Sequence, residues 1–150
     1  MKFEQTALVE APRDAVWETL MVMSEVARCV PGLVDFEDLG DGRYGGTLRV
    51  SVGPISLAMK GIVRYLSKDE AAARAVLSAA ATDARAAGSV KAETTIQLTA
   101  EHPSATRLDV RTEATILGRL GEFGQPIIRR KAEQLINEFA RNLTQAVAAR

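Results

Sequence analysis

Few side chains in this sequence could perform acid–base or nucleophilic chemistry, and those few lie far apart. The chain has one histidine, His102, which lies between Glu101 and Pro103 in a turn, and one cysteine, Cys29. One residue of each kind is too few for a Cys/His zinc site, and a single cysteine cannot form an internal disulfide. No histidine or group of cations near Cys29 would activate its thiol, so we interpret Cys29 as a small buried side chain.

Carboxylates and tyrosines do not complete a catalytic set. General acid–base catalysis needs a titratable group inside a pocket, whereas most Asp and Glu residues here occupy the polar positions of alternating segments. Tyr65 could serve in principle, although a buried tyrosine is usually structural. We therefore predict no catalytic residue, no metal site and no cofactor, and we expect that the protein is not an enzyme.

A long amphipathic helix at the C-terminal end of the chain is the element that the other segments must position. Proline at position 126 suits the first turn of a helix, where a missing N–H costs little. Over residues 126–149 such a helix would be about 36 Å long, enough to span a small domain. Its apolar residues recur at steps of three and four, which predicts one stripe that faces a core. The stripe consists of Ile128, Ala132, Leu135, Ile136, Phe139, Leu143 and Val147.

The segments before this helix predict a curved sheet. A first strand, Phe3–Val9, is followed by a helix that starts at Pro12 and a short second helix that Ser24 caps. Six segments with a period of two then follow, separated by turn signals such as Asp41-Gly42, and glycines such as Gly61 indicate bulges or sharp bends. The six are Val34–Leu39, Arg43–Val52, Ile55–Tyr65, Ala73–Thr82, Val90–Ala100 and Thr106–Ile116.

This order of elements predicts the α+β class. We expect a single domain over residues 1–150, with a curved antiparallel sheet of about seven strands wrapped around the C-terminal helix and two short helices after the first strand. The chain has 150 residues, of which 47 % are hydrophobic and 25 % charged, and its formal net charge is zero. These values are ordinary for one globular domain and give no general attraction to nucleic acid.

Location follows from segments that the sequence lacks. There is no leader-like N-terminal segment and no run of about 18 apolar residues, so we expect a cytoplasmic protein. Four basic residues gather near the start of the last helix: Arg119, Arg129, Arg130 and Lys131. They form either a solvated surface or a contact with an acidic partner or anionic lipid, which would place the protein peripherally at the inner face of the membrane.

Small side chains line the later strands on the face expected to meet the helix. They are Ala73, Ala75, Ala79, Ala81, Ala92, Thr94, Thr112 and Ala114. Because protein interiors are filled to crystal-like density, small residues either let the helix come very close or leave a pocket. The sequence leaves both outcomes open.

Several motifs together resemble one known family. They are Ala11-Pro12, Val16-Trp17, Leu20, Cys29-Val30-Pro31-Gly32, Val52-Gly53-Pro54-Ile55, Gly61, Leu117-Gly118-Arg119-Leu120, Phe123-Gly124 and Phe139-Ala140-Arg141-Asn142-Leu143. With these residues the whole chain is similar to the CoxG family of carbon monoxide dehydrogenase, which is a branch of the START-like or polyketide-cyclase-like (SRPBCC) helix-grip superfamily. The resemblance implies a helix-grip fold with a hydrophobic tunnel between sheet and long helix.

The resemblance also implies an accessory role. Members are associated with molybdenum hydroxylases of the carbon monoxide dehydrogenase type, and are thought to recruit them to the membrane or to handle a lipophilic carrier such as a quinone. Many members carry a C-terminal extension implicated in membrane attachment. The present chain ends with its helix at Arg150, so we do not expect stable anchoring by this chain alone.

We therefore favour a non-catalytic module that binds an apolar small molecule, a lipid or a quinone, for a molybdenum hydroxylase complex. A small cyclase- or hydratase-type enzyme and a purely structural interaction protein are the alternatives. The predicted ligand-binding residues, each of which would equally suit a packed core, are Trp17, Met21, Leu48, Leu57, Met59, Ala79, Ala92, Ile96, Phe123, Ile127 and Leu135.

Overall fold

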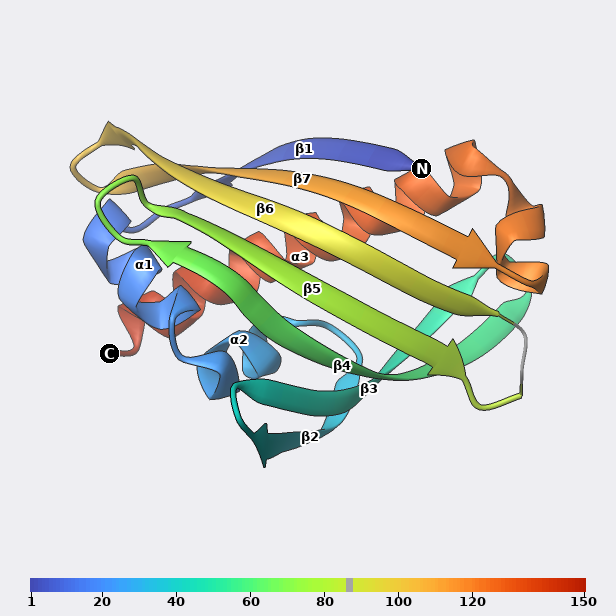
Figure 1. Cartoon of the computed structure of the whole chain (residues 1–150). Helices are drawn as coiled ribbons and strands as arrows, with labels where there is room; N and C mark the ends of the chain where they lie inside the picture. The colour runs from blue at the N-terminus through green and yellow to red at the C-terminus, as the bar shows by residue number, and fades with distance from the viewer. Residues whose placement is uncertain (86–87) are drawn as a thin grey trace.

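A single curved sheet with a long helix lying across it forms the molecule, as a computed structural model shows (Figure 1). The structure describes residues 1–85 and 88–150. The elements are β1 (Lys2–Val9), α1 (Arg13–Leu20), α2 (Met23–Cys29), β2 (Leu33–Gly40), β3 (Arg43–Val52), β4 (Ile55–Asp69), β5 (Arg74–Asp83), β6 (Ser89–His102), β7 (Ala105–Leu117), the 3₁₀ helix η1 (Arg119–Phe123) and α3 (Gln125–Ala148). The predicted α+β helix-grip arrangement is confirmed.

The sheet is antiparallel throughout, with the strand order β1-β7-β6-β5-β4-β3-β2. The chain runs as a meander from β2 to β7, and β1 then closes the far edge by pairing with β7. The predicted segment between β5 and β6, residues 83–89, includes residues 86 and 87, which lie outside the described part.

Strand β4 makes the sheet bend. A register shift between Tyr65 and Ser67 marks a bulge against β5, and bulges increase local bending and twist. Nearer the start of the strand, a Cβ added to Gly61 would lie 2.3 Å from the carbonyl oxygen of Ala80 and 2.7 Å from the Cβ of Ala81. Only glycine therefore allows β4 to approach β5 this closely, as the sequence pattern indicated.

The two short helices fill one end of the concave face, but the second is not capped as predicted. Helix α2 already includes Met23 and Ser24, and Val22 precedes it without any side-chain cap. The prediction that Ser24 caps this helix was wrong. Met23, in the first turn, is only 6 % exposed, so burial of an apolar side chain accompanies the start of α2 where we had expected a polar cap.

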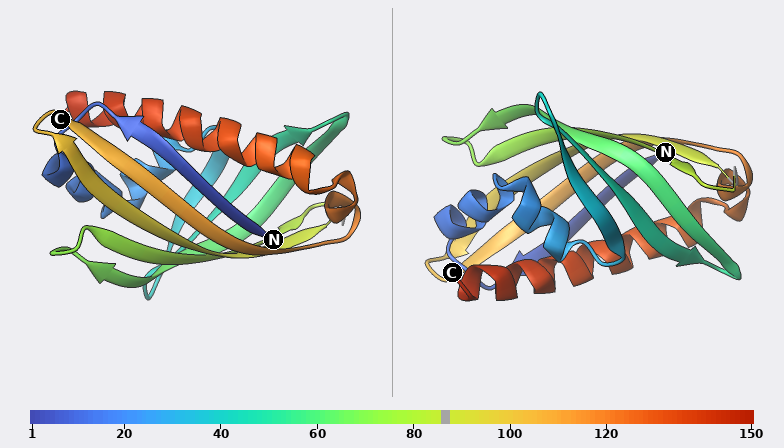
Figure 2. Two further views of the ribbon diagram at one scale, coloured as in Figure 1. Left: turned by 90° about the horizontal axis from the view of Figure 1, so that it is seen from above. Right: turned by 90° about the horizontal axis from the view of Figure 1, so that it is seen from below.

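Helix α3 crosses the concave side of the sheet, with α1 and α2 near its C-terminal end and η1 near its N-terminal end (Figure 2). Its bounds differ by one residue from those predicted. The side chain of Gln5 in β1 donates hydrogen bonds to the Glu133 carbonyl at 2.9 Å and to Asn137 Oδ1 at 3.2 Å. At the other end, Asn142 Nδ2 donates to the Cys29 carbonyl at 2.9 Å. Polar contacts therefore fix α3 to β1 and to α2.

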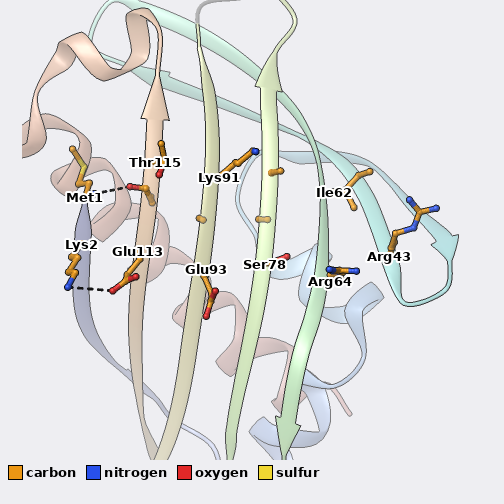
Figure 3. Close-up of a pocket in the computed structure, with 14 residues that line it drawn as sticks. Met1, Lys2, Arg43, Ile62, Arg64, Ser78, Lys91, Glu93, Glu113 and Thr115 are labelled. Atoms are coloured by element: carbon orange, nitrogen blue, oxygen red, sulfur yellow. Dashed lines mark hydrogen bonds and ion pairs between the residues drawn. The ribbon is translucent and has the colours of Figure 1, made fainter.

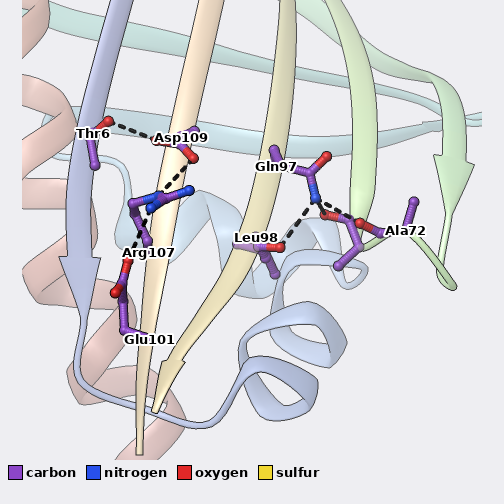
Figure 4. Close-up of polar contacts among 8 residues, drawn as sticks. Thr6, Ala72, Gln97, Leu98, Glu101, Arg107 and Asp109 are labelled. Atoms are coloured by element: carbon purple, nitrogen blue, oxygen red, sulfur yellow. Dashed lines mark hydrogen bonds and ion pairs between the residues drawn. The ribbon is translucent and has the colours of Figure 1, made fainter.

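Polar side chains on the outer face join β1, β7 and β6 (Figure 4). Asp109 accepts hydrogen bonds from Thr6 Oγ1 at 2.7 Å and from Arg107 Nε at 3.1 Å. The hydrogen bond from Thr6 and the contacts with Arg107 hold the pKa of Asp109 below its usual value. Arg107 also pairs with Glu101 at 3.2 Å. This network fixes the register of the last strands and lies away from the concave face.

Candidate ligand-binding site on the concave face

Two hydrophobic clusters close opposite ends of the concave face. The larger one packs α1 and the C-terminal half of α3 against the sheet, and it includes Trp17, Leu98, Leu108 and Leu143. The smaller one lies at the β3–β4 hairpin, where η1 covers Val52, Leu57 and Met59 with Leu120 and Phe123. A middle band of the concave face, which we call the central wall, separates the two clusters.

The central wall consists of small residues that α3 does not fully cover. One row of paired residues crosses it from β4 to β7: Val63, Ala79, Ala92 and Ala114. Because strand side chains alternate, Ala79 points to the same face as Ala75, which is buried in the larger cluster. Yet Ala79 is exposed, and Val63 and Ala92 are only half-buried. The alanines therefore leave accessible space between the two cores.

Hydroxyl groups are the polar features of this wall. The Thr94 and Thr112 hydroxyls hydrogen-bond each other across β6 and β7, with 2.9 Å between the two oxygens. The Tyr65 hydroxyl donates a hydrogen bond to the Leu20 carbonyl at the end of α1. Burial, with a smaller effect from Tyr44, raises the pKa of Tyr65 to about 12. Tyr65 is therefore neutral near pH 7, and its proton is already engaged.

Groups able to transfer protons lie elsewhere in the described part of the chain. The strand positions that face the central wall there carry no carboxylate, imidazole or thiol. His102 lies in the exposed β6–β7 turn beside Ser104. Cys29 is buried, and that burial raises the pKa of its thiol. Among the described residues there is also no group of three or more His, Cys, Asp or Glu that could hold a metal ion.

The predicted ligand-binding residues divide among these regions. Trp17, Met21 and Ile96 belong to the larger cluster or pack against it, and Leu48, Leu57, Met59 and Phe123 do the same at the smaller cluster. Ala79 and Ala92 lie on the central wall, whereas on α3 Leu135 is half-buried and Ile127 is 41 % exposed. Most of the predicted lining therefore closes the two ends of the face, and the two alanines stand at its centre.

Aromatic residues around the central wall were not predicted. The Phe36 and Tyr44 rings stack with centroids 5.9 Å apart, and Tyr44 pairs with Val63 on the wall. Phe3 pairs with Thr112 at the other side of the sheet. Only strand register, which alternation within single strands does not reveal, places these residues beside the alanines.

The four basic residues do not share one surface. Successive residues of a helix point about 100° apart, so Arg129, Arg130 and Lys131 spread around α3. The Arg129 guanidinium lies 5.7 Å from the centre of the Phe3 ring, and Lys131 is half-buried with its Nζ 3.3 Å from Gln134 Oε1. Arg119 lies in η1, where it lines a hollow with Arg85. No described helix is long and apolar enough to cross a membrane.

Comparison with known protein families places the chain. The family model for CoxG, which is part of carbon monoxide dehydrogenase, matches residues 6–148. The chain belongs to this family. No curated protein matches the chain.

Solved structures show the same START-like fold for this CoxG family member. A conserved protein from Geobacillus kaustophilus has 21 % identity and a TM-score of 0.89, over 99 % of this chain and 96 % of that one. A START superfamily protein from Mycobacterium smegmatis has 13 % identity and a TM-score of 0.69, over 99 % and 97 %. The ZhuI aromatase/cyclase from Streptomyces sp. R1128 has 19 % identity and a TM-score of 0.60, over 99 % and 92 %. At these identities the likeness shows the fold alone.

Proposed function

We propose that this CoxG family member is a non-catalytic carrier that binds a lipid- or quinone-like molecule between the central wall and α3. The observation that carries the proposal is the exposure of Ala79, an inward-facing residue of a middle strand. The walls of such a site would be alanine, valine and aromatic rings, so affinity would come from buried apolar area. At about 25 cal/mol per Å², a few hundred Å² of burial is enough for micromolar binding after the cost of immobilisation.

An enzymatic role is the alternative, because the fold also occurs in an aromatase/cyclase. The described residues of this chain favour the carrier. The central wall offers hydroxyl groups whose partners are Thr94, Thr112 and the Leu20 carbonyl, and the thiol, the imidazole and the carboxylates of the strands lie off it. Proton transfer needs a titratable group near the substrate with a pKa near the working pH. We accordingly expect no turnover by the isolated protein.

Family membership suggests which system the carrier serves. The family takes its description from carbon monoxide dehydrogenase, so we propose a molybdenum hydroxylase of that type as the partner complex. The carrier would help to recruit the enzyme or to handle its lipophilic electron acceptor. Mass spectrometry of an organic extract of the purified protein tests the ligand class directly, since a bound lipid or quinone should co-purify.

A pair of variants on neighbouring residues tests the location of the site. Ala79→Leu adds three carbon atoms on the central wall, whereas Ala80→Leu adds the same atoms on the outer face of the same strand. We expect Ala79→Leu to weaken uptake of a fluorescent fatty-acid or quinone probe at least tenfold while the melting temperature stays constant or rises. Ala80→Leu should bind the probe as the wild type does.

A packed interior would give the opposite result. If the alanines were closely packed, Ala79→Leu would overfill the core and destabilise the fold by about 1 to 3 kcal/mol. That loss, together with a wild-type protein that takes up no probe, would show the carrier proposal to be wrong. Equal loss of uptake in Ala79→Leu and Ala80→Leu would place the probe elsewhere.

A further inference from the structure

A row of charged side chains crosses the outer face of the sheet, on the side opposite the central wall (Figure 3). The strand register places them in one line across six strands. From β1 to β3 the row reads Lys2, Glu113, Glu93, Ser78, Arg64 and Arg43. Acidic residues therefore occupy the two strands on one side of β5, and basic residues occupy the two strands on the other.

This arrangement is unfavourable within one molecule. Glu93 pairs directly with Glu113, and Arg64 pairs directly with Arg43. Like charges in directly opposed positions of neighbouring strands destabilise a sheet by roughly 0.2 to 1 kcal/mol a pair. Lys2 lies 3.5 Å from Glu113, but both side chains are mostly exposed, and such pairs contribute little. Among the described residues, Glu93, Arg64 and Arg43 have no ion pair.

The centre of the row is low. Ser78 and Ala80, the outward residues in the middle of β5, line a hollow of about 690 Å³ whose other walls include Arg64 and Glu93. The long side chains therefore flank a floor of short ones. Next to Ala80, the exposed Ile62 adds apolar surface to the same hollow. An apolar floor with charged walls resembles the composition of protein interfaces.

We infer that this face binds a second copy of the same chain around a two-fold axis parallel to β5. Rotation about that axis places β4 of each copy over β6 of the other, because these two strands flank β5. Arg64 then faces the partner's Glu93, and Arg43 faces the partner's Glu113. Each like-charged pair thus meets a pair of opposite charge, and Ser78 meets itself where the side chains are shortest. A two-fold axis across the strands would instead stack Glu93 on Glu93.

The size of the patch predicts a weak dimer. Six strands at about 4.8 Å spacing make the row about 24 Å wide. With a similar extent along the strands, each copy would bury roughly 500 Å², which is at the lower end of specific interfaces. The contact is also largely electrostatic, so it should weaken as salt screens the charges.

Analytical ultracentrifugation of charge-reversal variants tests this arrangement. We expect the wild type at 100 μM to sediment largely as a dimer in 20 mM NaCl and as a monomer in 500 mM NaCl. Arg64→Glu and Glu93→Arg should each weaken dimerisation at least tenfold, because each places like charges across the two-fold axis. The combined variant restores opposite charges in both copies, so its dissociation constant should return to within about threefold of the wild type.

Two controls separate the interface from general effects of charge or folding. Arg141→Glu makes the same change in net charge on an exposed position of α3, and it should leave dimerisation unchanged. Arg64→Glu should keep its melting temperature, since it replaces the repulsion of Arg43 with attraction. A wild type that stays monomeric at 100 μM in 20 mM NaCl would overturn the inference. So would a combined variant that fails to recover the dimer.

Discussion

Tyr65 connects the sheet to the helical end of the concave face through one hydrogen bond, so Tyr65→Phe is a direct test of the structure. The phenol hydroxyl donates to the Leu20 carbonyl at the last residue of α1. Phenylalanine keeps the ring and its packing but removes the donor. A net loss of about 0.5 to 1.5 kcal/mol in the free energy of unfolding is expected near neutral pH.

The same variant should change how stability depends on alkaline pH. The Tyr65 pKa is raised from 10.0 to about 12 in the folded protein. Between these values the folded state holds a proton that the unfolded state has released, so stability falls as pH rises. For one group with this shift, the loss between pH 9 and pH 11 is about 1.3 kcal/mol. Phenylalanine cannot ionise, and the variant should escape this loss.

Urea unfolding of both proteins at pH 7, 9 and 11 measures the two effects together. Other titrating groups cancel in the difference between wild type and variant. The destabilisation caused by Tyr65→Phe should therefore shrink by about 1.3 kcal/mol between pH 9 and pH 11 and could change sign. A difference that is constant over this range would refute the reasoning, because it would mean that the hydroxyl is equally hydrated in both states.

Two further variants test the bend of the sheet and the outer network. Gly61→Ala should lower the free energy of unfolding by about 1 to 3 kcal/mol through overpacking, since its Cβ would meet the Ala80 carbonyl oxygen at 2.3 Å. In thermal melts Gly45→Ala on β3 should be mild by comparison, because its Cβ would meet only the movable Leu39 Cδ1 at 3.3 Å. Asp109→Asn removes a carboxylate whose pKa is lowered in the folded state. The wild type's advantage over this variant should be complete above the unfolded pKa, near 3.9, and should vanish in urea titrations as pH falls through the lower folded pKa. An advantage that persists at pH 2 would contradict this.

Local patterns predicted the elements well because their causes are local. The six alternating segments correspond to β2–β7, and the apolar stripe from Ile128 to Val147 lies within α3. Ser24 failed as a predicted cap because the burial of Met23, a tertiary effect, accompanies an earlier start of α2. Helix η1 was not predicted either. It is bounded by Gly118 and Gly124, both with positive φ, and Leu120 becomes buried only against the β3–β4 hairpin.

The sequence by itself determined the class of fold, the family and the scarcity of acid–base groups, since these depend on residue type and spacing along the chain. Only the tertiary structure decided whether the alanines pack tightly or leave space, because that depends on where α3 is held. Bonds from Gln5 and Asn142 fix α3 to β1 and α2, so that Ala79 stays exposed. The row from Lys2 to Arg43 likewise exists only through strand register, which joins residues up to 111 positions apart in neighbouring strands.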